Sequence, residues 1–120
     1  MQNFRQLKVW QKGHQLTLDV YGATTRFPRH EMFGLTSQLR RATSSVPSNL
    51  AEGCGRPADA DFGRFTGYAM GSASEAEYQL LLAHDLGYLP DSTYAERDAN
   101  AQEVKRMLSA LMRTLQKKQR

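Results

Sequence analysis

The stretch FGLTSQLRRATSSVPSNLAEG, residues 33–53, decides the fold. Its apolar and small residues recur every three or four positions: Leu35, Leu39, Ala42, Val46, Leu50 and Gly53. This spacing places them in one stripe along a helix, because an α-helix turns once every 3.6 residues. The stretch therefore predicts an amphipathic helix with one buried face.

Proline at position 47 is unusual inside such a helix. It has no backbone N–H, and its ring crowds the carbonyl group four residues earlier, which belongs to Thr43. We expect a kink near Thr43. We also expect the hydroxyl groups of Ser44, Ser45 and Ser48 to bond to the freed backbone groups.

Three further segments show the same periodicity, and glycine or proline residues separate them. The predicted helices cover about residues 7–25, 33–56, 59–87 and 91–116, within one domain of 120 residues. No useful stretch alternates between apolar and polar residues, which argues against a sheet. The sequence therefore predicts an all-α, antiparallel up-and-down four-helix bundle.

Small residues fill the middle of the third predicted helix, and Gly67 and Gly71 are among them. Glycine costs about 1 kcal/mol relative to alanine in a helix interior. We therefore expect a neighbouring backbone to approach this helix closely at the two glycines.

Charge is unevenly distributed along the chain, whose net charge is +4. Residues 1–58 carry a net charge of +5, residues 59–104 of −7 and residues 105–120 of +6. Such blocks suit binding to a polyanion, or pairing between the acidic band of one subunit and the basic band of another. Alternatively, basic and acidic helices lie side by side within one subunit, and the pattern leaves these interpretations open.

Catalytic and metal-binding patterns are hard to find in this sequence. The three histidines fall in different predicted segments, and the single cysteine, Cys54, has no evident base to activate it. We therefore predict no metal site, no cofactor and no enzymatic activity. An enzyme with a site at subunit interfaces, using Arg41, Glu52 and Glu75, is the remaining catalytic hypothesis.

Targeting and membrane signals are also absent from the pattern. No stretch approaches the roughly 18 consecutive apolar residues of a membrane span. The N-terminal residues include no apolar core typical of a secretory signal. We expect a cytoplasmic protein without a membrane partner.

A polar stripe accompanies the apolar stripe of the second helix. It consists of Arg41, Ser45, Asn49, Glu52 and Arg56, and Glu52 and Arg56 are spaced for an ion pair. One interpretation is a structural hydrogen-bond network with Glu75, either between helices or between subunits. The other is a surface that binds phosphate.

An ordered series of motifs runs through about residues 4–89. It comprises FRQLKVW at 4–10, FGL at 33–35, QLRRA at 38–42, NLAEG at 49–53, and GS at 71–72 followed by Glu75 and Glu77. Together these motifs resemble the four-helix-bundle proteins encoded in intervening sequences of 23S ribosomal RNA genes. Two positions depart from the family pattern: Gly13, where the family often has alanine, and Pro47 in the second helix.

The resemblance implies an all-α bundle that assembles into a ring-like homopentamer, in a family without an established catalytic activity. It also implies kinship with the accessory variability protein of diversity-generating retroelements. That relative binds nucleic acid and a reverse transcriptase through a basic surface.

The leading hypothesis is a non-enzymatic homo-oligomeric scaffold whose basic surface binds RNA, DNA or a ribonucleoprotein partner. The candidates for phosphate contacts are Lys8, Lys12, Arg26, Arg29, Arg40, Arg41, Lys105, Arg106, Arg113 and Lys117. Few aromatic residues interleave with them in the sequence, which argues against base stacking. The alternative is an adaptor that docks a partner protein without nucleic acid.

Overall fold

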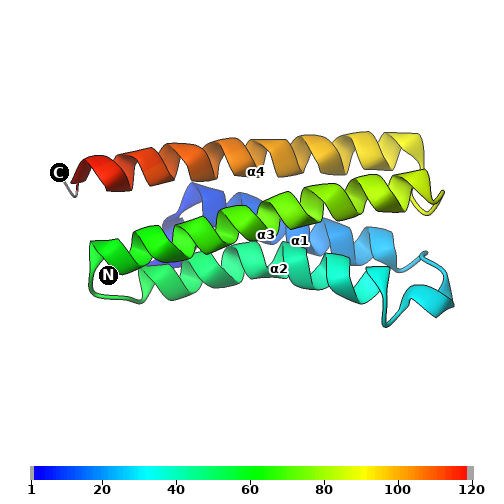
Figure 1. Ribbon diagram of the computed structural model, residues 1–120, viewed down its shortest axis with the longest axis horizontal. Coiled ribbons are helices and arrows are strands. Elements are labelled where there is room, and N and C mark those ends of the chain that lie inside the picture. The colour runs from blue at the N-terminus through cyan, green and yellow to red at the C-terminus, as the bar shows by residue number, and fades with distance from the viewer. Residues whose placement is uncertain (1, 119–120) are drawn as a thin grey trace.

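Figure 1 shows the computed structural model, which describes residues 2–118. Four long helices run antiparallel along an axis of 47 Å: α1 (Lys8–Thr24), α2 (Leu35–Cys54), α3 (Asp59–Asp85) and α4 (Asp91–Lys118). Short 3-10 turns precede the first two helices: η1 (Phe4–Gln6) and η2 (Arg29–Glu31). Residues 2–118 contain no strand, and the predicted all-α four-helix bundle is confirmed. The single-domain organisation stays a prediction.

The apolar stripe of α2 lies at the centre of the core. Leu39 and Leu50 of this stripe are completely buried, together with Leu80 of α3 and Leu108 of α4. Val20 of α1 joins the same cluster. Burial of one such side chain stabilises a fold by about 1.5–3 kcal/mol, so the spacing of these residues determines which helix faces meet. Within the described part of the chain, no helix has both the length and the apolar character needed to cross a bilayer.

The helix α2 continues through Pro47, and α1 supplies a group that compensates for the missing backbone bond. The Thr43 carbonyl, which Pro47 deprives of its usual donor, lies 3.3 Å from the hydroxyl of Thr17 on α1. Ser44 and Ser45 instead donate to a carbonyl that precedes Thr43. The expectation that these two serines bond to the freed carbonyl is therefore wrong.

Close packing of α1 against α2 makes the Thr17 contact possible. A Cβ atom built on Gly13 would lie 3.2 Å from Val46 Cγ1 and 3.7 Å from Pro47 Cδ, so the absent side chain lets the helices approach. The Thr17 hydroxyl also lies 2.8 Å from the Gly13 carbonyl oxygen and shares its one proton between two acceptors. Gly13 and Pro47, the two positions expected to depart from the family pattern, thus pack against each other.

A second close approach occurs at Gly53, near the end of α2. A Cβ atom there would lie 2.9 Å from Phe62 Cδ1 and 3.0 Å from Phe65 Cβ, both on α3. By contrast, nothing lies within 4 Å of a Cβ atom built on Gly67 or Gly71. The prediction of a close neighbour at these two glycines is wrong for the described residues of this chain, because they lie at the surface of α3.

Candidate nucleic-acid interface

A basic groove lies between α3 and α4, and we call it the α3–α4 groove. Its volume is about 490 Å³, and it is lined by Met70, Ser74, Gln102, Lys105, Arg106, Ser109 and Arg113. The α4 residues recur every three or four positions, which brings them to one face of the helix. Three of the predicted phosphate-binding residues, Lys105, Arg106 and Arg113, therefore meet in one place.

The basic side chains of the α3–α4 groove differ in their partners. Lys105 Nζ lies 2.7 Å from Glu77 Oε1, and Gln102 donates a second hydrogen bond to Glu77. These hydrogen bonds hold the pKa of Glu77 below its ordinary value, and the bond from Lys105 has the larger effect. Arg106 and Arg113 are exposed, and neither has a carboxylate oxygen within 4 Å among residues 2–118. Their guanidinium groups are therefore available to phosphate.

A second basic hollow lies where α1 and the start of α2 meet, and we call it the α1–α2 hollow. Its volume is about 400 Å³, and it is lined by Tyr21, Met32, Phe33, Thr36, Ser37, Arg40, Arg41 and Ser44. In Figure 1 this region lies near the end of the bundle where α1 connects to α2. The predicted candidates Arg40 and Arg41 thus share a hollow with two aromatic residues.

Arg40 is fixed within the α1–α2 hollow by contacts to α1. Its Nε donates to Thr24 Oγ1 at 2.8 Å, and its Nη2 donates to the Tyr21 carbonyl at 3.4 Å. Its guanidinium carbon lies 4.7 Å from the centre of the Tyr21 ring, a cation–π contact. Arg40 consequently contributes positive charge to the hollow but has few donors left for a ligand.

Arg41 and Phe33 are the more accessible members of the α1–α2 hollow. The Arg41 side chain is exposed, and its single hydrogen bond to the described residues runs from Nη2 to Ser37 Oγ at 3.5 Å. Phe33 is 95% exposed. Thr36 is 6% exposed, and its hydroxyl has no hydrogen-bond partner among residues 2–118.

Glu31 fixes the backbone that presents Met32 and Phe33. Its Oε1 accepts a hydrogen bond from the Leu35 amide at 3.1 Å, at the first turn of α2. Its Oε2 accepts one from the Tyr88 hydroxyl at 2.9 Å, which ties this turn to the connection between α3 and α4. The hydrogen bond from the Leu35 amide lowers the pKa of Glu31 most, and the hydrogen bond from the Tyr88 hydroxyl lowers it further. Its charge caps the helix at the site where the positive end of the helix dipole lies.

The remaining predicted candidates lie outside both hollows. They are Lys8 and Lys12 on α1, Arg26 and Arg29 between α1 and α2, and Lys117 near the end of α4. The structure therefore divides the predicted basic surface into separate parts.

Ion pairs within the chain join α4 to α1 and α3. They are Lys12–Glu103 at 3.1 Å, Asp19–Arg97 at 3.3 Å and Glu77–Lys105 at 2.7 Å. Basic and acidic helices thus lie side by side within one subunit, as one of the open interpretations held. These pairs reduce the charge available at Lys12 and Lys105 in particular.

Among residues 2–118, the predicted polar network does not form between helices of one chain. Glu52 and Arg56 pair at 2.8 Å along α2, as their spacing indicates. Asn49 donates to the Ser45 carbonyl on the same helix, and Glu75 accepts from Gln79 on α3. With Arg41 bonded to Ser37, each of these contacts stays within its own helix. The network between subunits stays a prediction.

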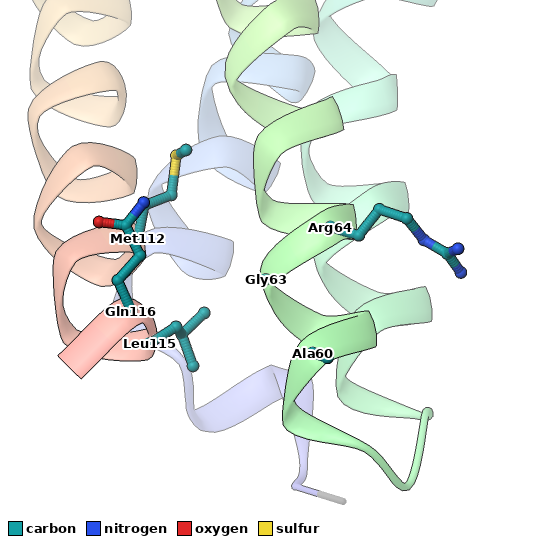
Figure 2. A pocket seen from close by; sticks show the side chains of 6 residues that line it. All are labelled: Ala60, Gly63, Arg64, Met112, Leu115 and Gln116. Carbon is teal, nitrogen blue, oxygen red and sulfur yellow. The ribbon is translucent and has the colours of Figure 1, made fainter. Parts of the chain in front are cut away.

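Figure 2 shows another hollow, at the end of the bundle where α3 begins and α4 ends. It has a volume of about 310 Å³, and Ala60 and Gly63 leave room for it beside Met112, Leu115 and Gln116. Arg64 extends away from α4 in this view and pairs with Asp61 at 3.2 Å. Because its one basic side chain points away, this hollow is a poor phosphate site.

The histidines and the cysteine lie apart from the basic hollows. His84 Nε2 lies 2.7 Å from Asp91 Oδ1, its ring stacks on Tyr94, and Asp85 lies 3.4 Å from Nδ1. Cys54 is buried, and burial raises the pKa of its thiol. Among residues 2–118, no group of three or more His, Cys, Asp or Glu side chains is arranged to hold a metal ion.

The aromatic part of the α1–α2 hollow was missed by the sequence analysis. Tyr21 and Phe33 are separated by the η2 turn, and the loop that folds back between α1 and α2 brings them to Arg40 and Arg41. Aromatic and basic side chains therefore share a hollow here, although few aromatic residues interleave with the basic ones in the sequence. A signal was present in the position of Phe33 at the first residue of the predicted helix 33–56, but periodicity assigns it to neither face.

The family comparison agrees with the fold. A family model described as "23S rRNA-intervening sequence protein" matches residues 5–110. No curated protein matches the sequence significantly.

A solved structure with a similar fold comes from Bacteroides thetaiotaomicron and is described as a protein of unknown function from the S23 ribosomal protein family. It is 21% identical in sequence, and the match covers 88% of this chain and 95% of that chain with a TM-score of 0.80. At this identity the similarity establishes the shared fold. Neither comparison identifies an enzymatic family.

Proposed function

Because this chain belongs to the 23S rRNA-intervening sequence protein family, we propose that it is a non-enzymatic scaffold that assembles with copies of itself and binds RNA or DNA. The observation that carries the proposal is the α3–α4 groove, where Arg106 and Arg113 lie exposed beside Lys105. A partner that neutralises these charges must present several anionic groups along a line, as a nucleic-acid backbone does.

The chemistry of the α3–α4 groove favours contacts to phosphate over contacts to bases. Each guanidinium group offers a planar fork of N–H donors that matches two phosphate oxygens. Ser74 and Ser109 add hydroxyl groups, and none of the described residues that line the groove is aromatic. Phosphate contacts position a nucleic acid without reading its sequence. We therefore expect binding that tolerates many sequences and weakens as salt is added.

Self-assembly would increase the attraction for a polyanion. The ring-like homopentamer that the resemblance implies would carry a net charge of about +20, five times the +4 of one chain. The exposed face of α3 supports contact between copies, because Tyr78 is 60% exposed and Leu81 is 41% exposed. Size-exclusion chromatography with light scattering measures the subunit number, and a monomer at micromolar concentration would contradict this part of the proposal.

The proposal includes no catalytic step. Arg41, Glu52 and Glu75, the residues considered for an interface enzyme, each bond to another residue of their own helix. Within residues 2–118, no hydrogen bond or ion pair joins any two of these three side chains.

Charge-removing variants test the groove. Arg106→Ala and Arg113→Ala should each weaken binding of a labelled RNA uniformly across sequences, and each should reduce the slope of log K against log salt by about 1. Arg64→Ala is the matched control, because it removes the same charge from an exposed residue that pairs with Asp61, points away from α4 and does not line the groove. Equal weakening by all three variants would show that net charge alone attracts the RNA. Unchanged binding by the two groove variants would refute the proposed site.

A protein-only adaptor is the second candidate function, and the outer face of α3 and α4 favours it. A hollow of about 240 Å³ is lined there by Ser74, Glu77, Tyr78, Leu81, Tyr94 and Asp98, and Leu81 is 41% exposed. Exposed aromatic and aliphatic side chains with an acidic rim suit a protein partner. This function predicts a partner protein that co-purifies equally well before and after nuclease treatment.

A further inference from the structure

We propose that the α1–α2 hollow binds one nucleotide of a single-stranded nucleic acid, with the phosphate on Arg41 and the base stacked on the ring of Phe33. The inference rests on the proposed function for the class of ligand. It adds a second contact that distinguishes single strands from duplexes, whereas the α3–α4 groove contacts phosphates of either.

The phosphate half of the site is built around Arg41. Its guanidinium group is exposed, has one long contact to Ser37 at 3.5 Å, and has no carboxylate oxygen within 4 Å among residues 2–118. Most of its donors therefore remain available for a bidentate contact to phosphate. Arg40 lies beside it and adds positive charge, while its own donors are held by Thr24 and Tyr21.

The base half of the site is the ring of Phe33. At 95% exposed, it is the most exposed of the large hydrophobic side chains that the structure describes, and it lines the same hollow as Arg41. Stacking on an aromatic ring beside a positive groove is the common mode of single-strand binding, because every base has a flat π face. In a duplex both faces of each base are already stacked, so Phe33 is available to unpaired bases alone.

An unsatisfied hydroxyl group lies at the inner wall of the hollow. Thr36 is 94% buried, since 6% of it is exposed, and its Oγ1 has no hydrogen-bond partner among the described residues. Buried polar groups nearly always have a partner. A phosphate oxygen or a base edge held between Arg41 and Phe33 would provide one after a small rotation of the threonine side chain.

The backbone that presents Phe33 is held in place before any ligand arrives. Glu31 bonds the Leu35 amide with one oxygen and the Tyr88 hydroxyl with the other, and Tyr88 also packs on Phe27 with ring centres 5.4 Å apart. Such preorganisation reduces the entropy lost on binding. Glu31 is also the acid closest in sequence to Phe33, and both its oxygens already accept hydrogen bonds.

A second copy of this chain is the other occupant that Met32 and Phe33 could attract, since both are exposed and apolar. Two observations favour the nucleotide instead. Among the described residues that line the hollow, two are arginines and none is an acid, and four bear hydroxyl groups: Tyr21, Thr36, Ser37 and Ser44. A phosphate uses these groups, whereas an apolar protein surface would leave them desolvated.

Substitutions at Phe33 test the proposal without disturbing the fold, because the side chain is almost entirely exposed. The probes are a fluorescein-labelled single-stranded RNA of about twelve nucleotides, the same RNA lacking its bases, and an RNA duplex of equal length. Phe33→Leu removes the aromatic face but keeps the apolar bulk, and Phe33→Trp keeps the face. Tyr68→Leu, at a 52% exposed aromatic residue on α3, is the matched control.

We expect Phe33→Leu to weaken binding of the single strand about tenfold and to leave duplex binding unchanged. Phe33→Trp should bind the single strand as the unchanged protein does, and the fluorescence of the introduced indole should be quenched by the RNA with bases but not by the RNA without them. Arg41→Gln should weaken binding of both single strands. Tyr68→Leu should bind all probes normally.

Contrary outcomes separate this site from the proposed function. If Phe33→Leu binds every probe normally, the nucleotide site is refuted while the α3–α4 groove remains. If the unchanged protein binds no RNA at low salt, both proposals are refuted. If Phe33→Leu alters the subunit number in light scattering but not the affinity for RNA, Phe33 is a contact between copies and the nucleotide site is refuted.

Discussion

Replacement of Gly53 by alanine should destabilise the bundle, although the same change usually stabilises a helix. The new Cβ atom would lie 2.9 Å from Phe62 Cδ1 and 3.0 Å from Phe65 Cβ. Both phenylalanines are buried, at 4% and 9% exposed, so neither ring can move away freely. Gly71→Ala is the matched control, because nothing lies within 4 Å of a Cβ atom there.

The magnitude follows from two opposing effects. Adding a methyl group to a packed core costs about 1–3 kcal/mol, whereas alanine is about 1 kcal/mol better than glycine inside a helix. Gly53→Ala should therefore lose about 1 kcal/mol of unfolding free energy. Gly71→Ala should gain about 0.5–1 kcal/mol, because it obtains the helix preference without the clash.

Urea denaturation followed by circular dichroism measures both values under identical conditions. We expect the two midpoints to fall on opposite sides of the midpoint of the unchanged protein, with similar slopes. A Gly53→Ala protein as stable as the original would refute the close approach of α2 and α3. A destabilised Gly71→Ala protein would contradict the open space at the surface of α3.

Two further predictions concern a buried carbonyl and a pH effect. Thr17→Val should lower the unfolding free energy measured by urea denaturation by about 1 kcal/mol, because the Thr43 carbonyl loses its hydrogen bond. This loss should be smaller in a Pro47→Ala background, where a backbone N–H returns to the carbonyl. An equal loss in both backgrounds would contradict the coupling. The hydrogen bond to Asp91 raises the pKa of His84, so its stabilisation is complete below the unfolded pKa of about 6.5 and is lost as pH rises through the higher folded pKa. His84→Gln should therefore lower the Tm at pH 5.5 more than at pH 8, and the opposite order would contradict the ion pair.

The fold was predictable because one physical effect dominates it. The stripe from Leu35 to Gly53 repeats at helical spacing, and all of its members are buried in the structure. What periodicity could not supply was the identity of the neighbour at each position. The partner of the Thr43 carbonyl is Thr17, which is distant in sequence, and the close approach expected at Gly67 occurs at Gly53 instead.

The candidate site was predictable only in part, for a related reason. Arg106 and Arg113 share one helix face, so their spacing along α4 was enough to place them together. Phe33 and Arg41 share a hollow with Tyr21 of α1, and the path of the chain from α1 to α2, which brings Tyr21 to them, is not encoded by any periodic pattern. Lys12 is equally basic in the sequence, yet in the structure it pairs with Glu103 on α4. Whether a basic residue has an acidic partner depends on which helices are adjacent, and the periodic pattern does not give this.

The salt dependence of RNA binding tests the central claim most directly. Fluorescence anisotropy of a labelled RNA with the unchanged protein, measured from about 50 to 200 mM salt, gives the slope of log K against log salt. A protein that uses Arg106, Arg113 and Arg41 on phosphate should bind at the low end and lose at least about tenfold in affinity across this range. Absence of binding at 50 mM salt, or an affinity that salt does not change, would contradict the claim that these basic hollows hold a nucleic acid.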